Sequence, residues 1–157
     1  AGDVVGGWLL AHVATSEGIT AAENALGRGS PIDYTAVPVT IYTLPEIARV
    51  GMTEQEAEEA GLEIKTGRIP FAANGKAKGM REEEGFVKWV AGKDDGRLLG
   101  LHVIGPQATE LVAAGIVAVR GKMSAADFSA AIFPHPTLCE ALHEASEAVE
   151  GRAIHAL

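Results

Sequence analysis

The residues with most chemical potential lie at positions 133–140, whose sequence is FPHPTLCE. His135 stands between two prolines just ahead of a predicted helix, and because prolines fix the backbone, the imidazole is held in a defined place. Glu140 follows five residues later, in the first turn of that helix. Its carboxylate could accept a hydrogen bond from one ring nitrogen, which would leave the other nitrogen free as a base. The spacing indicates the base and the orienting acid of a catalytic triad without its nucleophile.

A structural explanation of the same segment is also open. Thr137 and Glu140 are spaced as a capping box, which is a common signature of a helix start. Cys139 could act as a nucleophile, since a helix start stabilises a thiolate, but small buried cysteines are common. It is the chain's one cysteine, so an internal disulfide and a multi-cysteine metal site are excluded. A single thiol is typical of a reduced, cytoplasmic protein.

The remaining candidates are more dispersed. His102 is expected in a strand, as a core or sheet-face residue, whereas His143 and His155 are expected at solvated or helix-end positions. These contexts differ too much to predict a metal site. Asp3, after Gly2, could contact a sugar hydroxyl or a ribityl chain, although a capping aspartate in a glycine-rich turn is the simpler interpretation. The helix start that follows could face an anion or a polarised carbonyl.

Length and composition limit the classes of protein. The chain has 157 residues, 47% hydrophobic and 22% charged, which fits one domain or one domain plus part of another. A formal net charge of −8 disfavours nucleic acid as a partner. The longest apolar run, residues 111–119, is too short to span a bilayer. The start, AGD, is neither basic nor hydrophobic, so no signal peptide is expected.

The elements that must position these residues change in type along the chain. A helix is predicted over 8–25, ended by glycines, and residues 29–31 read as a linker. The expected strands are 39–43, 62–69, 85–90 and 98–104, the last two joined by a turn at 94–96. The expected later helices are 53–61, 109–120 (apolar nearly all round and therefore buried), a short one from 124, and 137–149. Strands followed by helices predict an α+β fold with an antiparallel sheet flanked by helices.

Taken together, these segments resemble the dihydrolipoamide dehydrogenases, flavin disulfide reductases of the pyridine nucleotide-disulfide oxidoreductase family. The resemblance runs in order along nearly the whole chain. It is carried by AGDV at 1–4 with Leu10, Ala11 and His12, by VTIYTLPEIARVG at 39–51, by FAANGKA at 71–77, by LGLHVIGP at 99–106, and by HPTLCEAL at 135–142.

The resemblance implies a division of the chain and a set of roles. Residues 1–30 would be the C-terminal piece of a FAD-binding domain, including its last helix, and residues 31–157 the dimerisation (interface) domain. The histidine matching His135 acts in the family as base toward the dithiol, at the other subunit's disulfide, and the glutamate matching Glu140 orients it. Asp3 would contact the flavin ribityl chain, and the backbone of Leu10, Ala11 and His12 would lie beside the flavin ring.

The same resemblance implies cofactors and partners. The full-length enzyme would be a cytoplasmic homodimer that uses FAD and NAD and serves the lipoyl domain of a 2-oxo-acid dehydrogenase complex, without nucleic acid or membrane. A redox-active cysteine pair, a FAD loop and a NAD domain belong to the family's longer chain and are not in this sequence. We therefore expect this chain to be inactive alone.

Two departures from the family pattern and two alternatives accompany this prediction. Phe133 replaces the first histidine of the family's His-x-His-Pro, and Cys139 replaces a serine. The chain could instead be the dimerisation domain of a glutathione reductase-like enzyme, inert in isolation, although Leu138 and Ala141 favour the lipoamide branch. A small independent thiol enzyme using Cys139 and His135 is the remaining hypothesis.

Overall fold

The computed structural model describes residues 1–29 and 31–155 in two compact units, Ala1–Val37 and Pro38–Leu157. Ser30, in the middle of the expected linker, lies outside the described residues. So do the last two residues, 156–157, of the expected interface domain.

The first unit contains a short 3-10 helix, η1 (Asp3–Val5), and one long helix, α1 (Ala11–Ala25). Helix α1 begins three residues later than predicted because Leu10 is still extended, with φ −133° and ψ 132°. Glu17 ties the unit together: its carboxylate accepts hydrogen bonds from the Gly2 N–H at 2.6 Å and from the Tyr34 hydroxyl at 2.9 Å. The Gly2 N–H, followed by the Tyr34 hydroxyl, lowers the pKa of Glu17 below its usual value.

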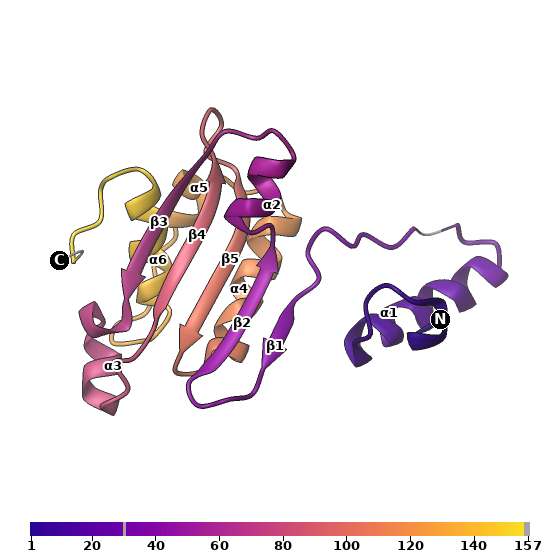
Figure 1. Cartoon of the computed structure of the whole chain (residues 1–157), viewed down its shortest axis with the longest axis horizontal. Helices are drawn as coiled ribbons and strands as arrows, with labels where there is room; N and C mark the ends of the chain where they lie inside the picture. Colours follow the sequence, from indigo (N-terminus) through magenta and orange to yellow (C-terminus); the bar gives the residue numbers. More distant parts are fainter. Residues whose placement is uncertain (30, 156–157) are drawn as a thin grey trace. The chain divides into compact units, whose positions relative to one another are not determined.

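The second unit is built on a five-stranded sheet in the order β1-β2-β5-β4-β3, in which every neighbouring pair is antiparallel (Figure 1). Its strands are β1 (Val39–Ile41), β2 (Glu46–Gly51), β3 (Ile64–Pro70), β4 (Phe86–Gly92) and β5 (Leu98–Gly105). The turn between β4 and β5 closes with a Gly96 N–H···O=C Gly92 bond of 3.0 Å. The predicted α+β fold with an antiparallel sheet is therefore confirmed.

The helices of this unit have two roles. Two long helices, α4 (Ala108–Arg120) and α6 (Glu140–Val149), pack on the sheet, α4 over β2 and β5 and α6 over β3 and β4 (Figure 1). Short elements connect the strands and helices: α2 (Glu54–Glu59), η2 (Phe71–Ala73), α3 (Gly75–Met80) and α5 (Ala125–Ser129). The core between sheet and helices is fully buried around Trp89, Leu101 and Leu142. The Trp89 indole N–H donates to the Leu142 carbonyl at 3.0 Å, which joins β4 to α6.

Four elements differ from what the sequence predicted. Helix α4 is buried on one face only, and Val117 on its outer face is 67% exposed, because an apolar helix lying on one side of a sheet has a single partner. Strand β2 and helix α3 were not predicted as elements. Helix α6 begins at Glu140 rather than at Thr137.

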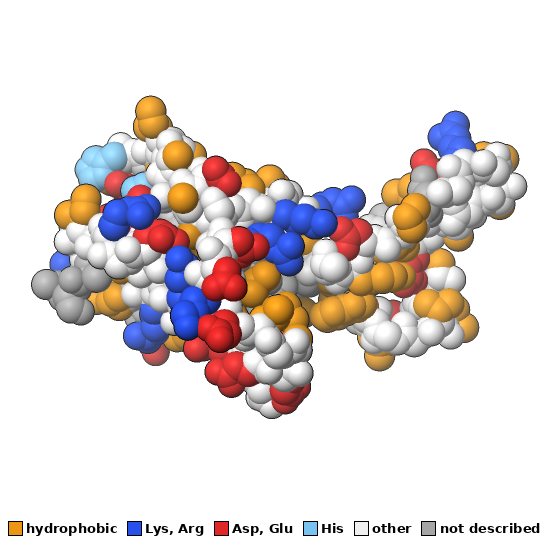
Figure 2. All heavy atoms as spheres, turned by 90° about the horizontal axis from the view of Figure 1, so that it is seen from above, with side chains coloured by type: hydrophobic (Ala, Val, Ile, Leu, Met, Phe, Trp, Pro, Cys, Tyr) orange, Lys and Arg blue, Asp and Glu red, His pale blue; other side chains and the backbone are white. Residues whose placement is uncertain are grey.

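Large apolar side chains are exposed at several places on the surface. Leu44 is 99% exposed and Ile132 is 98% exposed. Figure 2 shows such side chains as orange areas between the charged ones. In the part of the chain that the structure describes, no helix combines the length and the apolarity needed to cross a membrane.

Candidate active site

The start of α6 places Glu140 toward the preceding loop. Cys139, partly buried, occupies the N-cap position in a helical conformation and makes no capping bond with its side chain. The N–H of Thr137 donates to Glu140 Oε2 at 2.8 Å, but the Thr137 hydroxyl donates to the Pro134 carbonyl, also at 2.8 Å. Only half of the predicted capping box forms, because the hydroxyl is used inside the loop.

His135 and Glu140 are brought together as the spacing predicts. Nδ1 of the imidazole lies 2.8 Å from Glu140 Oε1, and the histidine side chain is 78% exposed. Burial alone would raise the pKa of Glu140, but the Thr137 N–H and His135 outweigh it and hold this pKa below its usual value. An ionised carboxylate can only accept a hydrogen bond, so Nδ1 carries a proton, and in the neutral imidazole Nε2 then has the free lone pair. The pair therefore has the arrangement of an oriented base.

A second carboxylate–histidine pair lies one helical turn further along α6. Glu144 Oε2 accepts from the backbone N–H groups of Ile154 and His155, each at 3.0 Å, and Glu144 Oε1 lies 3.1 Å from His155 Nδ1. Burial would raise the pKa of Glu144, but the His155 contacts, with the Ile154 N–H, lower it overall. This pair was not predicted, although the four-residue spacing of Glu140 and Glu144 places both glutamates on one helix face.

Both pairs border one cavity of about 230 Å³. Its lining includes Asn74, Lys78, His135, Glu140 and His155. Asn74 and Lys78 come from α3 and its cap, so an element that the sequence analysis did not predict contributes to the site. The motif FAANGKA contains Asn74, and Lys78 follows it directly, so a cap residue followed by a short helix could have been read from this stretch.

The other histidines have structural contacts. His102 in β5 donates from Nε2 to the Met52 carbonyl at 3.0 Å, which agrees with the predicted sheet position. Burial lowers the pKa of His102. His143, expected at a solvated or helix-end position, lies in the first turn of α6 and is half-buried: its Nε2 lies 3.0 Å from the Ser129 carbonyl, and its ring packs against Phe133 with centroids 5.3 Å apart. Phe133 thus packs on His143 of α6, and this contact supports the segment of the loop before His135.

The four candidate cofactor-binding residues all lie in the first unit. Asp3 is exposed at the beginning of η1, and Leu10 is the N-cap residue of α1, where it provides no side-chain cap. Ala11 and His12 form the exposed first positions of α1. A helix start without a side-chain cap presents backbone N–H groups that suit a polar or anionic group. Among residues 1–29 and 31–155, no three His, Cys, Asp or Glu side chains lie close enough to hold a metal ion.

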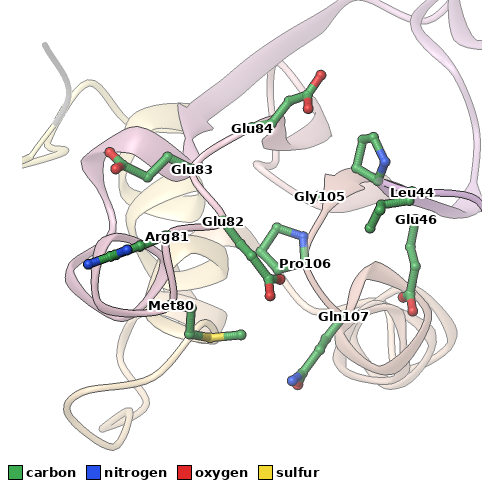
Figure 3. A pocket seen from close by; sticks show the side chains of 11 residues that line it. Leu44, Glu46, Met80, Arg81, Glu82, Glu83, Glu84, Gly105, Pro106 and Gln107 are labelled. Atoms are coloured by element: carbon green, nitrogen blue, oxygen red, sulfur yellow. The ribbon is translucent and has the colours of Figure 1, made fainter.

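A second hollow, of about 600 Å³, lies at the end of the sheet where β2 begins and β5 ends (Figure 3). Glutamates 46, 82, 83 and 84 are part of its lining, and neither His135 nor Glu140 is. Glu46 is already engaged, since its Oε2 accepts from the N–H and hydroxyl of Thr109 at 3.0 and 2.8 Å. This hollow arises where three connections between elements meet, so no local sequence pattern indicates it.

Comparison with known proteins gives consistent relatives. The chain is 46% identical to dihydrolipoyl dehydrogenase 2 of Haloarcula marismortui and 46% identical to the dihydrolipoyl dehydrogenase of Thermus scotoductus, over 98% and 99% of its length. It spans only 33% and 34% of these two proteins. Among solved structures, LpdA from Mycobacterium tuberculosis superimposes with a TM-score of 0.87 at 33% identity, covering 94% of this chain and 32% of that chain. The HOCl-induced flavoprotein disulfide reductase RclA from Escherichia coli superimposes with a TM-score of 0.86 at 26% identity. This match covers 93% of this chain and 34% of that chain.

The family itself follows from a match to most of the second unit. Residues 37–146 match the sequence model described as "Pyridine nucleotide-disulphide oxidoreductase, dimerisation domain". This range includes the whole sheet, α4, and the His135–Glu140 pair. The chain belongs to the pyridine nucleotide-disulphide oxidoreductase family and carries the dimerisation domain of a dihydrolipoamide dehydrogenase-type member.

Proposed function

We propose that this chain supplies the catalytic base and the dimer interface of an enzyme that oxidises dihydrolipoamide to lipoamide, with NAD as the electron acceptor. The observation that carries the proposal is the 2.8 Å contact between His135 Nδ1 and Glu140 Oε1 in an exposed loop. The dihydrolipoyl dehydrogenases to which the chain is similar support the choice of substrate.

The role of the pair is proton transfer. With Nδ1 bonded to the Glu140 carboxylate, His135 Nε2 takes the proton from a substrate thiol and becomes part of an imidazolium. The neighbouring carboxylate stabilises this positive charge. The thiolate that is left is the species that attacks a disulfide, whereas the thiol is not. Glu140 stays ionised throughout and acts by holding the ring.

Residues 1–30 would complete a FAD-binding domain, and residues 31–157 would form the interface of a homodimer. Asp3 would hold the ribityl chain, and Leu10, Ala11 and His12 would lie beside the flavin ring; the exposure of Asp3, Ala11 and His12 and the uncapped start of α1 fit such contacts. FAD, when bound, would carry electrons from the dithiol to NAD. The lipoyl domain of a 2-oxo-acid dehydrogenase complex is the partner that would present the substrate.

An inert dimerisation domain is the second candidate, and the chain's span of about a third of its relatives favours it for this chain in isolation. The two proposals apply at different scales. An assay of the isolated chain with dihydrolipoamide, FAD and NAD should give no turnover, and measurable turnover would contradict the inert assignment.

The test of the catalytic assignment is His135→Gln in the full-length dimeric enzyme. Loss of a positioned general base typically costs about 10²–10⁴-fold in rate, so oxidation of dihydrolipoamide should fall by that order. Reduction of the flavin by NADH requires no thiol deprotonation, so it should change much less and provides an internal control. Near wild-type turnover of dihydrolipoamide would remove the catalytic assignment altogether.

A further inference from the structure

Asn74 is the buried polar residue that connects α3 to the His135 loop. Its side chain is held at both ends: Oδ1 accepts from the Ala77 N–H at 2.9 Å, and Nδ2 donates to the Thr137 carbonyl at 3.1 Å. The residue is only 5% exposed. Asn74 and Thr137 are 63 positions apart, so this bond fastens two separate segments together beside the cavity that His135 and Glu140 border.

Thr137 is held on three sides. Its carbonyl accepts from Asn74, its N–H donates to Glu140 Oε2, and its hydroxyl donates to the Pro134 carbonyl. The first bond comes from outside the loop, whereas the other two join the loop to itself and to α6. The Asn74 amide therefore forms a hydrogen bond that ties the backbone at Thr137 to a segment outside the loop and α6, in addition to the apolar packing of Phe133.

We propose that Asn74 is a positioning residue for the His135–Glu140 pair and acts through Thr137. The inference rests on the proposed function for its catalytic consequence. With the Thr137 carbonyl anchored, its N–H stays aimed at Glu140 Oε2, and Oε1 is left to face His135. Without that anchor, the backbone at Thr137 is held less firmly, and the loop that carries His135 can shift relative to α6, which carries Glu140.

The capping of α3 alone does not explain an asparagine at this position. A cap needs only an oxygen acceptor, and the capping residues of two other short helices, Thr53 for α2 and Ser124 for α5, supply it with a hydroxyl. The carboxamide adds an N–H donor, which the Thr137 carbonyl uses. Removing that donor would leave the carbonyl without a bond that part-buried groups normally have.

Asn74→Ser separates the two roles in the full-length enzyme, because serine caps helices well and is too short to reach Thr137. We expect kcat for dihydrolipoamide to fall about 10-fold or more with little change in KM, since a displacement of about 1 Å can cost about 100-fold. NADH-dependent flavin reduction should be unchanged. Nitrogen NMR of labelled His135 should show loss of the single tautomer with the proton on Nδ1. Asn74→Asp, which keeps both shape and cap, should do the same and serves if Asn74→Ser folds poorly.

Thr53→Ala is the matched control, because it uncaps a helix of the same length away from the site. It should leave kcat and the tautomer of His135 as they are. If both Asn74 variants keep wild-type kcat and tautomer while His135→Gln is severely impaired, the positioning role is overturned and the proposed function stands. If His135→Gln is harmless but the Asn74 variants change the tautomer, the proposed function fails and the positioning role stands.

Discussion

At the scale of single residues, Glu140 divides its two oxygens between two partners. One accepts from the Thr137 N–H and the other contacts His135, so an ionised carboxylate satisfies two donors at once. Glutamine has one acceptor oxygen and cannot serve both. Glu140 thus has a structural role in the loop and an orienting role toward the imidazole. Substituting Glu140 shows which of the two roles affects the rate.

Glu140→Gln should slow dihydrolipoamide oxidation in the full-length enzyme by less than His135→Gln does, because the imidazole remains while its charged partner is lost. We expect a decrease of about 10-fold, below the roughly 10²–10⁴-fold effect of removing a general base. Stopped-flow measurement of flavin reduction by the dithiol provides the comparison. A rate equal to wild type would leave Glu140 with its loop-capping role alone.

Glu144 should make the stability of the segment at Ile154 and His155 depend on pH. Its pKa in the folded state lies below the usual value, so ionised Glu144 stabilises the folded tail above the unfolded pKa, about 4.3 for a glutamate. This stabilisation is lost as the pH falls through the lower folded-state pKa. Amide proton shifts of Ile154 and His155 should therefore move toward unstructured values in acid. In Glu144→Gln this acid step should be absent, and an identical step in that variant would assign it to another group.

At the scale of elements, the site depends on how closely α6 approaches β3. Gly67 in β3 makes this approach possible, because a Cβ there would lie 2.8 Å from Val149 Cγ2 and closer still to the Ala145 carbonyl and the Val149 nitrogen. The obstructing atoms include helix backbone, which cannot move aside as a flexible side chain can. A glycine in the middle of a strand therefore sets the position of the helix that begins with Glu140.

Gly67→Ala should destabilise the protein by about 1–3 kcal/mol, the usual cost of overpacking a core. Urea denaturation followed by tryptophan fluorescence measures it, since Trp89, one of the chain's two tryptophans, is opposite Gly67 in the sheet and bonds to α6. The matched control is Gly79→Ala in α3, where an added Cβ meets no atom within 4 Å. That variant should be neutral or more stable by up to about 1 kcal/mol, because alanine favours a helix over glycine. Equal stability of both variants would contradict close packing at Gly67.

The sequence predicted elements best where one local signal decided the structure. Strand alternation located β3, β4 and β5, and the hydroxyl caps Thr53 and Ser124 located α2 and α5. Helix α3 was missed because it is short and rich in glycine and depends on the cap and burial of Asn74. The His135–Glu140 pair followed from spacing, but its connection to Asn74 did not. No local pattern encodes a bond between residues so far apart in sequence.

At the scale of the whole molecule, the second unit exposes several large apolar side chains that its own sheet–helix core does not bury. Tyr42 is 79% exposed, and Leu44, Val117 and Ile132 are also open to solvent. Isolated exposed apolar residues are normal, whereas a contiguous apolar patch is typical of a surface that binds a partner. The proposed homodimer would give such side chains a partner, since stable interfaces bury roughly 1,200–2,000 Å².

The two compact units should differ strongly in local stability. The first unit has few buried apolar side chains, Val13 and Ala36, and helix α1 exposes Ile19. Isolated helices of about 12–15 residues are marginal in water, and α1 has 15. Hydrogen–deuterium exchange of the dilute chain should therefore be fast throughout α1 and slow by several orders of magnitude in β4 and β5, whose central side chains are fully buried. Strong protection of α1 in a dilute monomer would show that the first unit is stable by itself. Protection that appears only as the concentration rises would instead indicate that α1 contacts a neighbouring molecule.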